Sequence, residues 1–283
     1  MKNNIQRFYF PARVQEAARL LGRLKSKAVV VGGGTRLPSV LPAAVEAVID
    51  LSDLPLKYVK ADKKWLRIGA LCTLAQLEAE PLLKGWAGGV ISVAAGFGAS
   101  AVIRSMGTVG GNIVRAYPYN NLPPVFLALG AQVAFTDGAR EEAASYDDFQ
   151  KPKLGWQMGS RYLVTEVRVP AETKTWAAAA SRIAGVKTDW VATANCAVAV
   201  DKKDGVCRKA AIALGALLPR ATRFKKAESV LESAPCGDAS ARAAEASVAG
   251  ELSALLRATA ANAYASEVAA VLVRRSLLEA FNN

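Results

Sequence analysis

The chain has 283 residues, 52% of them hydrophobic, and its 36 lysines and arginines against 24 acidic residues give a formal net charge of +12. This composition excludes a disordered chain and predicts an ordered globular protein of one large or two modest domains. The sequence contains no histidine, which excludes His-based triads, His-ligated metals and imidazole acid–base chemistry, so any redox chemistry must come from a bound cofactor.

Targeting and metal-binding patterns are missing from the sequence. No apolar run approaches the ~20 residues that span a bilayer, and residues 1–8 lack the apolar stretch of a signal peptide. We therefore expect a cytoplasmic protein with no transmembrane segment. The cysteines Cys72, Cys196, Cys207 and Cys236 form no C-x-x-C pair, so we predict idle thiols, and neither a metal site nor an iron–sulfur cluster in this chain.

The positive charge is scattered in ones and twos, as in Lys63-Lys64 and Lys202-Lys203. This pattern is typical of a solvated basic surface, of a kind that suits docking onto acidic subunits. Recognition-helix, zinc-finger and RNA-binding aromatic motifs are absent from the sequence, and we predict no nucleic-acid partner. A basic nucleic-acid-binding or scaffolding protein is the alternative, and it would show salt-dependent DNA binding and no colour.

The first half of the chain alternates strands, helices and two glycine segments. Hydrophobic spacing predicts a helix over residues 11–25, and a β-branched strand at 28–31 runs into Gly-Gly-Gly-Thr at 32–35. Thr73 and Gln76 form a capping box for a helix that extends to Leu83. The remaining predicted elements are a strand at 47–51, a hairpin of 58–60 with 65–68, a small-residue helix at 90–104, a second glycine segment at 107–113, a short helix from Asn121 and a strand at 131–135.

The pattern changes at residues 170–175, which we predict to be a domain boundary. An antiparallel pair, 196–200 with 210–214, flanks the turn Lys203-Asp204-Gly205. Three helical stretches follow, at 221–232, 239–256 and 263–280. Strands followed by helices favour a separate α+β domain.

The two glycine segments favour binding of a dinucleotide. Glycine lets the backbone approach a ligand closely, and consecutive N–H groups in such turns bind anions. Two segments that each carry a threonine suit two phosphates held from either side. A Rossmann fingerprint is disfavoured because its third glycine is replaced by Leu37, and a P-loop is disfavoured because no lysine follows either segment.

Taken together, the segments resemble the flavoprotein subunit of the xanthine dehydrogenase and carbon monoxide dehydrogenase family. That family's first flavin loop, Ala-Gly-Gly-Thr-Asp-Leu, is matched by Gly-Gly-Gly-Thr-Arg-Leu at 32–37, and its second, Gly-Thr-Ile-Gly-Gly-Asn-Ile, by residues 107–113 with one Ile-to-Val change. Ile68-Gly69-Ala70, the strand at 165–170 and the helix at 266–275 extend the resemblance over essentially the whole chain. Arg36 and Asn121 stand where the family has Asp, and Ser181-Arg182 stands near its lysine.

The resemblance implies an α+β fold: an FAD-binding domain of the vanillyl-alcohol oxidase type at residues 1–172, with lobes of about 1–54 and 55–172, and a smaller α+β domain at 173–283. It implies that this chain binds FAD and contributes no catalytic side chain. The implied cofactor-binding residues are Gly32, Gly33, Gly34, Thr35, Arg36, Leu37, Thr108, Val109, Gly110, Gly111, Asn112, Asn121, Thr165 and Arg182, with the glycine segments holding the FAD pyrophosphate.

The same resemblance implies a molybdenum hydroxylase in which this subunit passes electrons between an iron–sulfur subunit and an external acceptor. The molybdenum cofactor and the iron–sulfur clusters belong to partner subunits, and the family suggests a dimer of heterotrimers. Two alternatives share the fold: a self-contained FAD-dependent reductase, similar to the cell-wall enolpyruvate reductases, and a degenerate flavin-free structural subunit.

Overall fold

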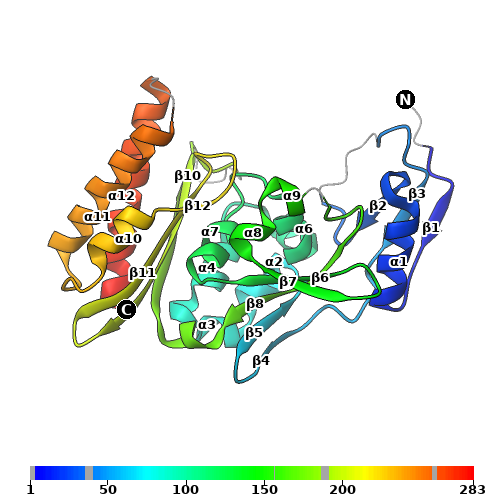
Figure 1. The fold of residues 1–283 in the computed structure, drawn as a ribbon, viewed down its shortest axis with the longest axis horizontal. Helices are drawn as coiled ribbons and strands as arrows, with labels where there is room; N and C mark the ends of the chain where they lie inside the picture. Colours follow the sequence, from blue (N-terminus) through cyan, green and yellow to red (C-terminus); the bar gives the residue numbers. More distant parts are fainter. Residues whose placement is uncertain (1–3, 36–40, 156, 186–190, 257–259) are drawn as a thin grey trace. The chain divides into compact units, whose positions relative to one another are not determined.

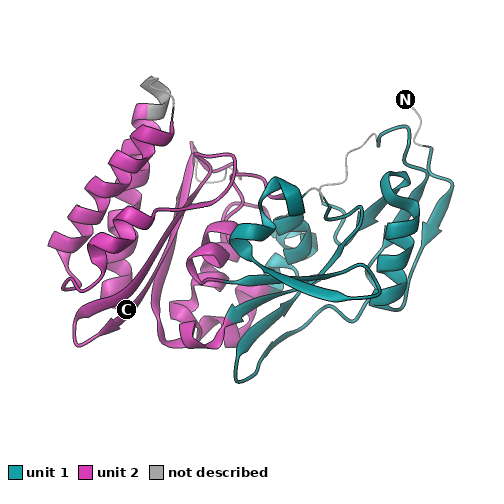
Figure 2. Cartoon of the chain, in the orientation of Figure 1, with its two compact units in different colours: residues 1–76, 101–115, 131–169 teal, residues 77–100, 116–130, 170–283 magenta. Residues whose placement is uncertain are grey.

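A computed structural model describes residues 4–35, 41–155, 157–185, 191–256 and 260–283 (Figure 1). The chain forms two compact units (Figure 2). Unit 1 comprises Met1–Gln76, Ala101–Arg115 and Ala131–Val169, and unit 2 comprises Leu77–Ser100, Ala116–Gly130 and Pro170–Asn283. The chain thus passes between the units several times. The predicted division into domains at residue 172 stays a prediction.

Unit 1 begins with a small parallel sheet covered by one helix. The strands β1 (Arg7–Tyr9), β2 (Ala28–Val31) and β3 (Ala47–Asp50) lie in the order β1-β3-β2. Helix α1 (Val14–Leu24) buries Ala17, Ala18 and Leu21 against this sheet, because those residues recur at helical spacing. The 3-10 turn η1 (Lys25–Lys27) leads from α1 directly into β2.

The second sheet of unit 1 has five strands in the order β4-β5-β8-β6-β7. Its strands are β4 (Val59–Ala61), β5 (Trp65–Gly69), β6 (Gln132–Thr136), β7 (Glu141–Ser145) and β8 (Leu163–Pro170). Strand β8 has buried side chains on both of its faces, because it lies at the centre of the sheet. Unit 1 also holds α5 (Ala101–Met106), α6 (Val109–Arg115), α8 (Tyr146–Phe149) and α9 (Pro152–Gly155).

Unit 2 is built on an antiparallel sheet with helices on both faces. The strands β9 (Ala177–Ile183), β10 (Ala194–Lys203), β11 (Val206–Gly215) and β12 (Thr222–Arg223) lie in the order β12-β11-β10-β9. Helices α10 (Lys225–Leu231), α11 (Asp238–Leu255) and α12 (Ala260–Asn282) pack on the face that carries Cys196 and Val198. Helix α7 (Leu122–Ala128) lies on the other face (Figure 1).

The remaining elements connect these layers. Helix α2 (Leu74–Ala79) starts in unit 1 and ends in unit 2, where α3 (Pro81–Lys84), η2 (Ala87–Gly89), α4 (Val90–Gly96) and η3 (Ala171–Thr175) follow in chain order. The capping box of α2 is confirmed: the Thr73 N–H donates to Gln76 Oε1 over 2.9 Å, and the Gln76 N–H donates to Thr73 Oγ1 over 3.2 Å.

The structure divides two of the predicted helices and shortens a third. The helix expected to extend to Leu83 ends at Ala79, because Glu80 is extended ahead of Pro81. The helix expected over 90–104 is split into α4 and α5, since Phe97 is extended and Gly98 takes a φ of +82°. The helix expected from residue 221 begins at Lys225, because Thr222 and Arg223 pair with β11 instead.

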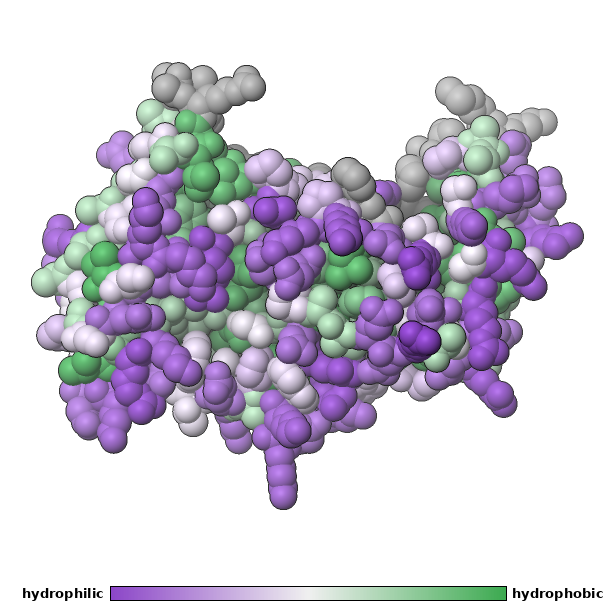
Figure 3. All heavy atoms as spheres, viewed as in Figure 1, coloured by the Kyte–Doolittle hydropathy of each residue, from purple (hydrophilic) through white to green (hydrophobic). Residues whose placement is uncertain are grey.

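The surface is mixed in hydropathy. On the face drawn in Figure 3, hydrophilic residues are spread over the molecule and interrupted by small hydrophobic patches. Among the described residues, no helix is long and apolar enough to cross a membrane.

Candidate flavin-binding site

The two glycine segments lie directly against each other in unit 1. The first follows the end of β2, and the second runs from the end of α5 into α6. A Cβ atom on Gly33 would stand 1.7 Å from the carbonyl oxygen of Met106, and one on Gly32 would stand 3.1 Å from Thr108 Oγ1. The close approach therefore requires glycine at position 33, and it brings together two segments that are about seventy residues apart in the sequence.

Residues 70–72 support both segments. The Ala70 carbonyl accepts a hydrogen bond from the Gly110 N–H over 2.8 Å, and the Cys72 carbonyl accepts one from the Val109 N–H over 2.9 Å. The Leu71 side chain lies 3.3 Å from the position that a Cβ on Gly32 would take. No role was predicted for this stretch, although the Ile68-Gly69-Ala70 match was a signal that could have identified it.

The first segment presents backbone N–H groups that have no acceptor among the described residues. None of the backbone N–H groups of residues 32–35 donates to a residue in the described parts of the chain. Gly34 has a φ of +69°, a left-handed conformation that glycine adopts without strain. Successive free N–H groups at such a turn form a concavity that suits an anion.

The backbone amides of the second segment donate to residues 70–72 and to Thr108. Besides the bonds of Val109 and Gly110, the Gly111 N–H donates to Thr108 Oγ1 over 3.2 Å, and the Asn112 N–H donates to the Thr108 carbonyl over 2.9 Å. Thr108 thus acts as the turn's internal acceptor, while the hydrogen of its hydroxyl is available to a ligand.

Thr165 adds a buried hydroxyl to this arrangement. It lies on β8 with 8% of its surface exposed, and no described residue offers its Oγ1 a hydrogen-bond partner. Its carbonyl accepts a hydrogen bond from the Ala70 N–H over 2.9 Å, so residues 70–72 contact β8 as well as both glycine segments. A buried hydroxyl without a partner is costly, and a ligand atom would satisfy it.

Two predicted site residues belong to unit 2. Asn121 precedes α7, and its amide is bonded at both ends: Nδ2 donates to the Phe97 carbonyl over 3.2 Å, and Oδ1 accepts from Asn195 Nδ2 over 3.0 Å. Arg182 lies on β9, directly opposite Asn195 on β10. Arg36 and Leu37, also predicted, lie outside the described residues.

Glu166, which follows Thr165 in the chain, lies in a network of charged and polar groups. Glu166 accepts hydrogen bonds from Tyr58 Oη over 2.6 Å, from Arg67 over 2.7 Å and from Arg168 over 2.5 Å. Burial alone would raise the pKa of Glu166, but these hydrogen bonds and the two guanidinium charges outweigh it and hold the pKa below its ordinary value. The carboxylate is therefore ionised near neutral pH and is the anionic partner of the two arginines.

Burial shifts the titration of two thiols of unit 2. Burial raises the pKa of Cys196 to about 11 and that of Cys207 to about 12, so both are protonated near neutral pH. In the described ranges, no group of three or more cysteine, aspartate or glutamate side chains could hold a metal ion.

Comparison with known proteins identifies the class. Residues 3–172 match the family described as the FAD binding domain in molybdopterin dehydrogenase, and residues 179–280 match the CO dehydrogenase flavoprotein C-terminal domain. The chain belongs to this family: it is the FAD-binding oxidoreductase subunit of a molybdenum hydroxylase. The predicted family, fold class and cofactor are thus confirmed.

Individual relatives agree with this assignment. The chain is 28% identical to the carbon monoxide dehydrogenase medium chain of Hydrogenophaga pseudoflava over 220 residues, and this stretch covers 76% of each of the two chains. It is 25% identical over 283 residues to the nicotine 6-hydroxylase medium subunit of Paenarthrobacter nicotinovorans, which is 99% of each. The solved structure of the Hydrogenophaga pseudoflava carbon monoxide dehydrogenase matches with a TM-score of 0.86 and 26% identity, over 100% of this chain and 99% of that one.

Proposed function

We propose that this chain holds FAD with its two glycine segments and passes electrons between an iron–sulfur subunit and an external acceptor. The observation that carries the proposal is the row of four N–H groups at residues 32–35, next to Thr108, which donate to no residue in the described parts of the chain. Bound FAD supplies the redox chemistry of the subunit. The absence of histidine and the depressed pKa of Glu166 agree with a subunit that positions a cofactor and performs no acid–base step.

Each part of the site has a proposed task. The N–H groups of Gly32, Gly33, Gly34 and Thr35 donate to the pyrophosphate, and the Thr108 hydroxyl donates from the second segment. The Thr165 hydroxyl makes a hydrogen bond to the cofactor. Arg36, Leu37, Val109, Gly110, Gly111, Asn112, Asn121 and Arg182 complete the proposed set.

Absorption spectroscopy tests the proposal directly. The chain purified from its native host is expected to show flavin bands, and chromatography of the heated supernatant is expected to identify FAD. Because the N–H donors of residues 32–35 match a pyrophosphate, FMN should not replace FAD. A colourless chain that takes up no added FAD would contradict the proposal.

Thr165→Val tests the buried hydroxyl. Valine has nearly the same shape, so the free energy of unfolding of the FAD-free chain should stay constant or rise slightly, because an unsatisfied polar atom is removed. The affinity for FAD should fall about two- to tenfold, which corresponds to one lost hydrogen bond. Fluorescence titration with FAD measures the affinity.

Thr136→Val is the matched control. Thr136 is also buried, on β6 of the same five-stranded sheet. Its Oγ1, however, accepts a hydrogen bond from the Gly138 N–H over 2.9 Å and donates one to the Arg140 carbonyl over 2.6 Å. Its replacement should therefore destabilise the chain and leave the FAD affinity unchanged. Equal FAD affinity in Thr165→Val and the wild type would remove Thr165 from the site.

The assembly forms part of the proposal. Relatives are named medium chain and medium subunit, which supports a complex with an iron–sulfur subunit and a large molybdopterin-binding subunit. We infer a dimer of heterotrimers in the cytoplasm, with substrate bound on the large subunit. Light scattering of the complex isolated from its host should give the mass of two copies of each subunit, and the mass of a single heterotrimer would overturn the dimer.

A further inference from the structure

Asn195 occupies the middle of a row of residues across the unit 2 sheet. On β10 it pairs with Arg182 of β9 on one side and with Gly215 of β11 on the other. Only 2% of its surface is exposed. Its neighbours Ala194 and Cys196 point into the core formed with α10–α12, so the Asn195 side chain lies on the opposite face, where α7 packs.

The Asn195 amide forms hydrogen bonds with the loop that precedes α7, at residues 119–121. Its Nδ2 donates to the carbonyls of Tyr119 and Asn120, over 3.2 Å and 3.0 Å, and to Asn121 Oδ1 over 3.0 Å. Asn121 in turn donates to the Phe97 carbonyl. The two hydrogens of this one NH₂ group are shared among three acceptors, so the group holds three consecutive residues, and through Asn121 it also holds the segment that follows α4.

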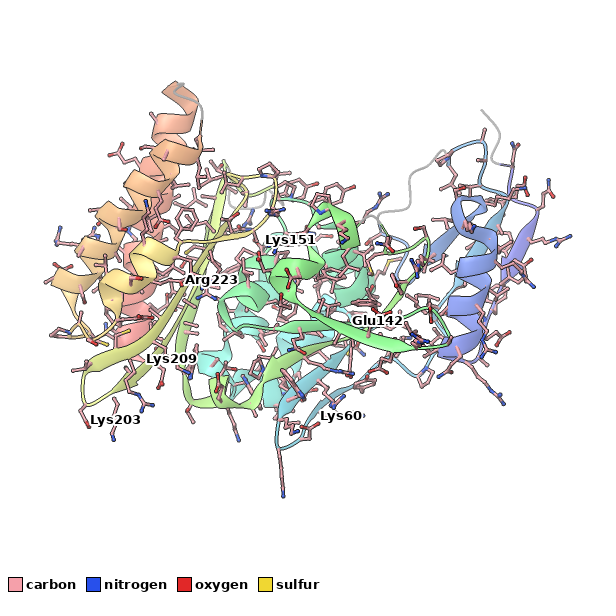
Figure 4. The ribbon with its side chains drawn as sticks, viewed as in Figure 1. Lys60, Glu142, Lys151, Lys203, Lys209 and Arg223 are labelled. Carbon is pink, nitrogen blue, oxygen red and sulfur yellow. The ribbon has the colours of Figure 1, made fainter. Side chains whose placement is uncertain are left out.

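The surroundings leave room for this amide and little else. A Cβ on Gly215 would stand 2.3 Å from Asn195 Oδ1 and 3.0 Å from the Pro118 carbonyl. The Ala216 N–H donates to the same carbonyl over 2.7 Å. The far end of α7 is held as well, because Arg223 (Figure 4) donates to the Leu127 carbonyl over 3.3 Å.

The amide at position 121 also follows from this geometry. An aspartate there could still accept from Asn195, but it has no hydrogen to donate to the Phe97 carbonyl. Asn121 therefore makes a hydrogen bond to Phe97 that an aspartate could not make. The position of the Asn121 side chain also depends on the N–H donor that Asn195 supplies.

We infer that Asn195 is a positioning residue for FAD, which acts by fixing the loop at Asn121 and lies beside Arg182. The inference rests on the proposed function, since it takes Asn121 and Arg182 as FAD contacts. Asn195 itself does not touch the cofactor. It provides the donor that holds the loop in one conformation, and a preorganised loop binds its ligand without an ordering cost.

A double-mutant cycle tests the inference. Asn195→Ala is expected to lower the FAD affinity about tenfold and to change the visible circular dichroism of the bound flavin. Asn195→Asp should be worse, because it turns an anion towards three acceptor oxygens. If Asn195 acts through the loop, Asn121→Ala combined with Asn195→Ala should bind FAD no more weakly than Asn195→Ala alone, since effects along one chain of contacts do not add.

Controls separate this inference from the proposed function. Wild-type FAD binding is measured first, and its absence would defeat the proposed function itself. Lys203→Ala, at the exposed end of β10 (Figure 4), should bind FAD as the wild type does. If Asn195→Ala does not fold, Asn195→Ser retains one donor and should bind with intermediate affinity. Unchanged affinity and dichroism in a folded Asn195 variant, or strictly additive losses in the cycle, would overturn the inference.

Discussion

Replacing Gly33 by alanine is expected to abolish FAD binding. The new methyl group would stand 1.7 Å from the Met106 carbonyl oxygen and 2.6 Å from its carbon, far inside van der Waals contact. The obstacle is backbone, so no side-chain rotation relieves it. The two glycine segments must move apart, and the N–H donors of the first segment then lose their position relative to Thr108.

The expected cost is about 3 kcal/mol of unfolding free energy or more, in the upper range of overpacking substitutions. The flavin content of the purified variant and its urea denaturation curve measure both effects. Gly22→Ala is the matched control: it lies within α1, and nothing stands within 4 Å of its added Cβ. That variant should keep its FAD and gain up to about 1 kcal/mol from helix propensity. A Gly33→Ala chain with full FAD content would show that the two segments need not touch.

The sequence predicted the structural features of the candidate site that depend on local chemistry. Gly33 and Gly34 sit in a recognisable motif, because close approach and positive φ angles can be met by few residue types. The hairpin at Asp204 and Gly205 was predictable for the same reason, and both residues have positive φ angles. The capping box at Thr73 is equally local, since its donors and acceptors are three residues apart.

Features that depend on distant contacts were not predictable. Asn195 lies in an apolar run that resembles any buried strand, and its task appears only when β10 meets a loop some seventy residues earlier. The supporting stretch at 70–72 acts through backbone carbonyls, which any residue carries. Strand β9 begins with four alanines, whose weak strand propensity hid it until its pairing with β10 was known.

The network around Glu166 is a second long-range feature, and it holds together the sheet that carries Thr165. Strand β8 places the Glu166 carboxylate against Tyr58 and Arg67 from the β4–β5 region, and Arg168 also contacts Glu141 on β7. Glu166 is only 4% exposed, whereas its arginine partners are partly solvated, with side chains 28% and 17% exposed. Breaking a buried ion pair by removing one partner costs more than breaking a surface pair.

Glu166→Gln is therefore expected to lower the free energy of unfolding by about 3 kcal/mol at pH 7. The folded-state pKa of Glu166 is depressed, so its contribution is complete above the unfolded-state pKa of roughly 4.3 and is lost as the pH falls through the folded-state value. Urea denaturation at pH 7, 5, 4 and 3 should show a gap between wild type and variant that is constant down to pH 5 and then narrows. Asp62→Asn is the control, because Asp62 pairs with Arg67 in solvent, with its side chain 46% exposed, and its loss should cost less than about 1 kcal/mol. A gap that widened towards acid pH would mean that Glu166 is protonated in the folded chain, and the two arginines would then not be its counter-ions.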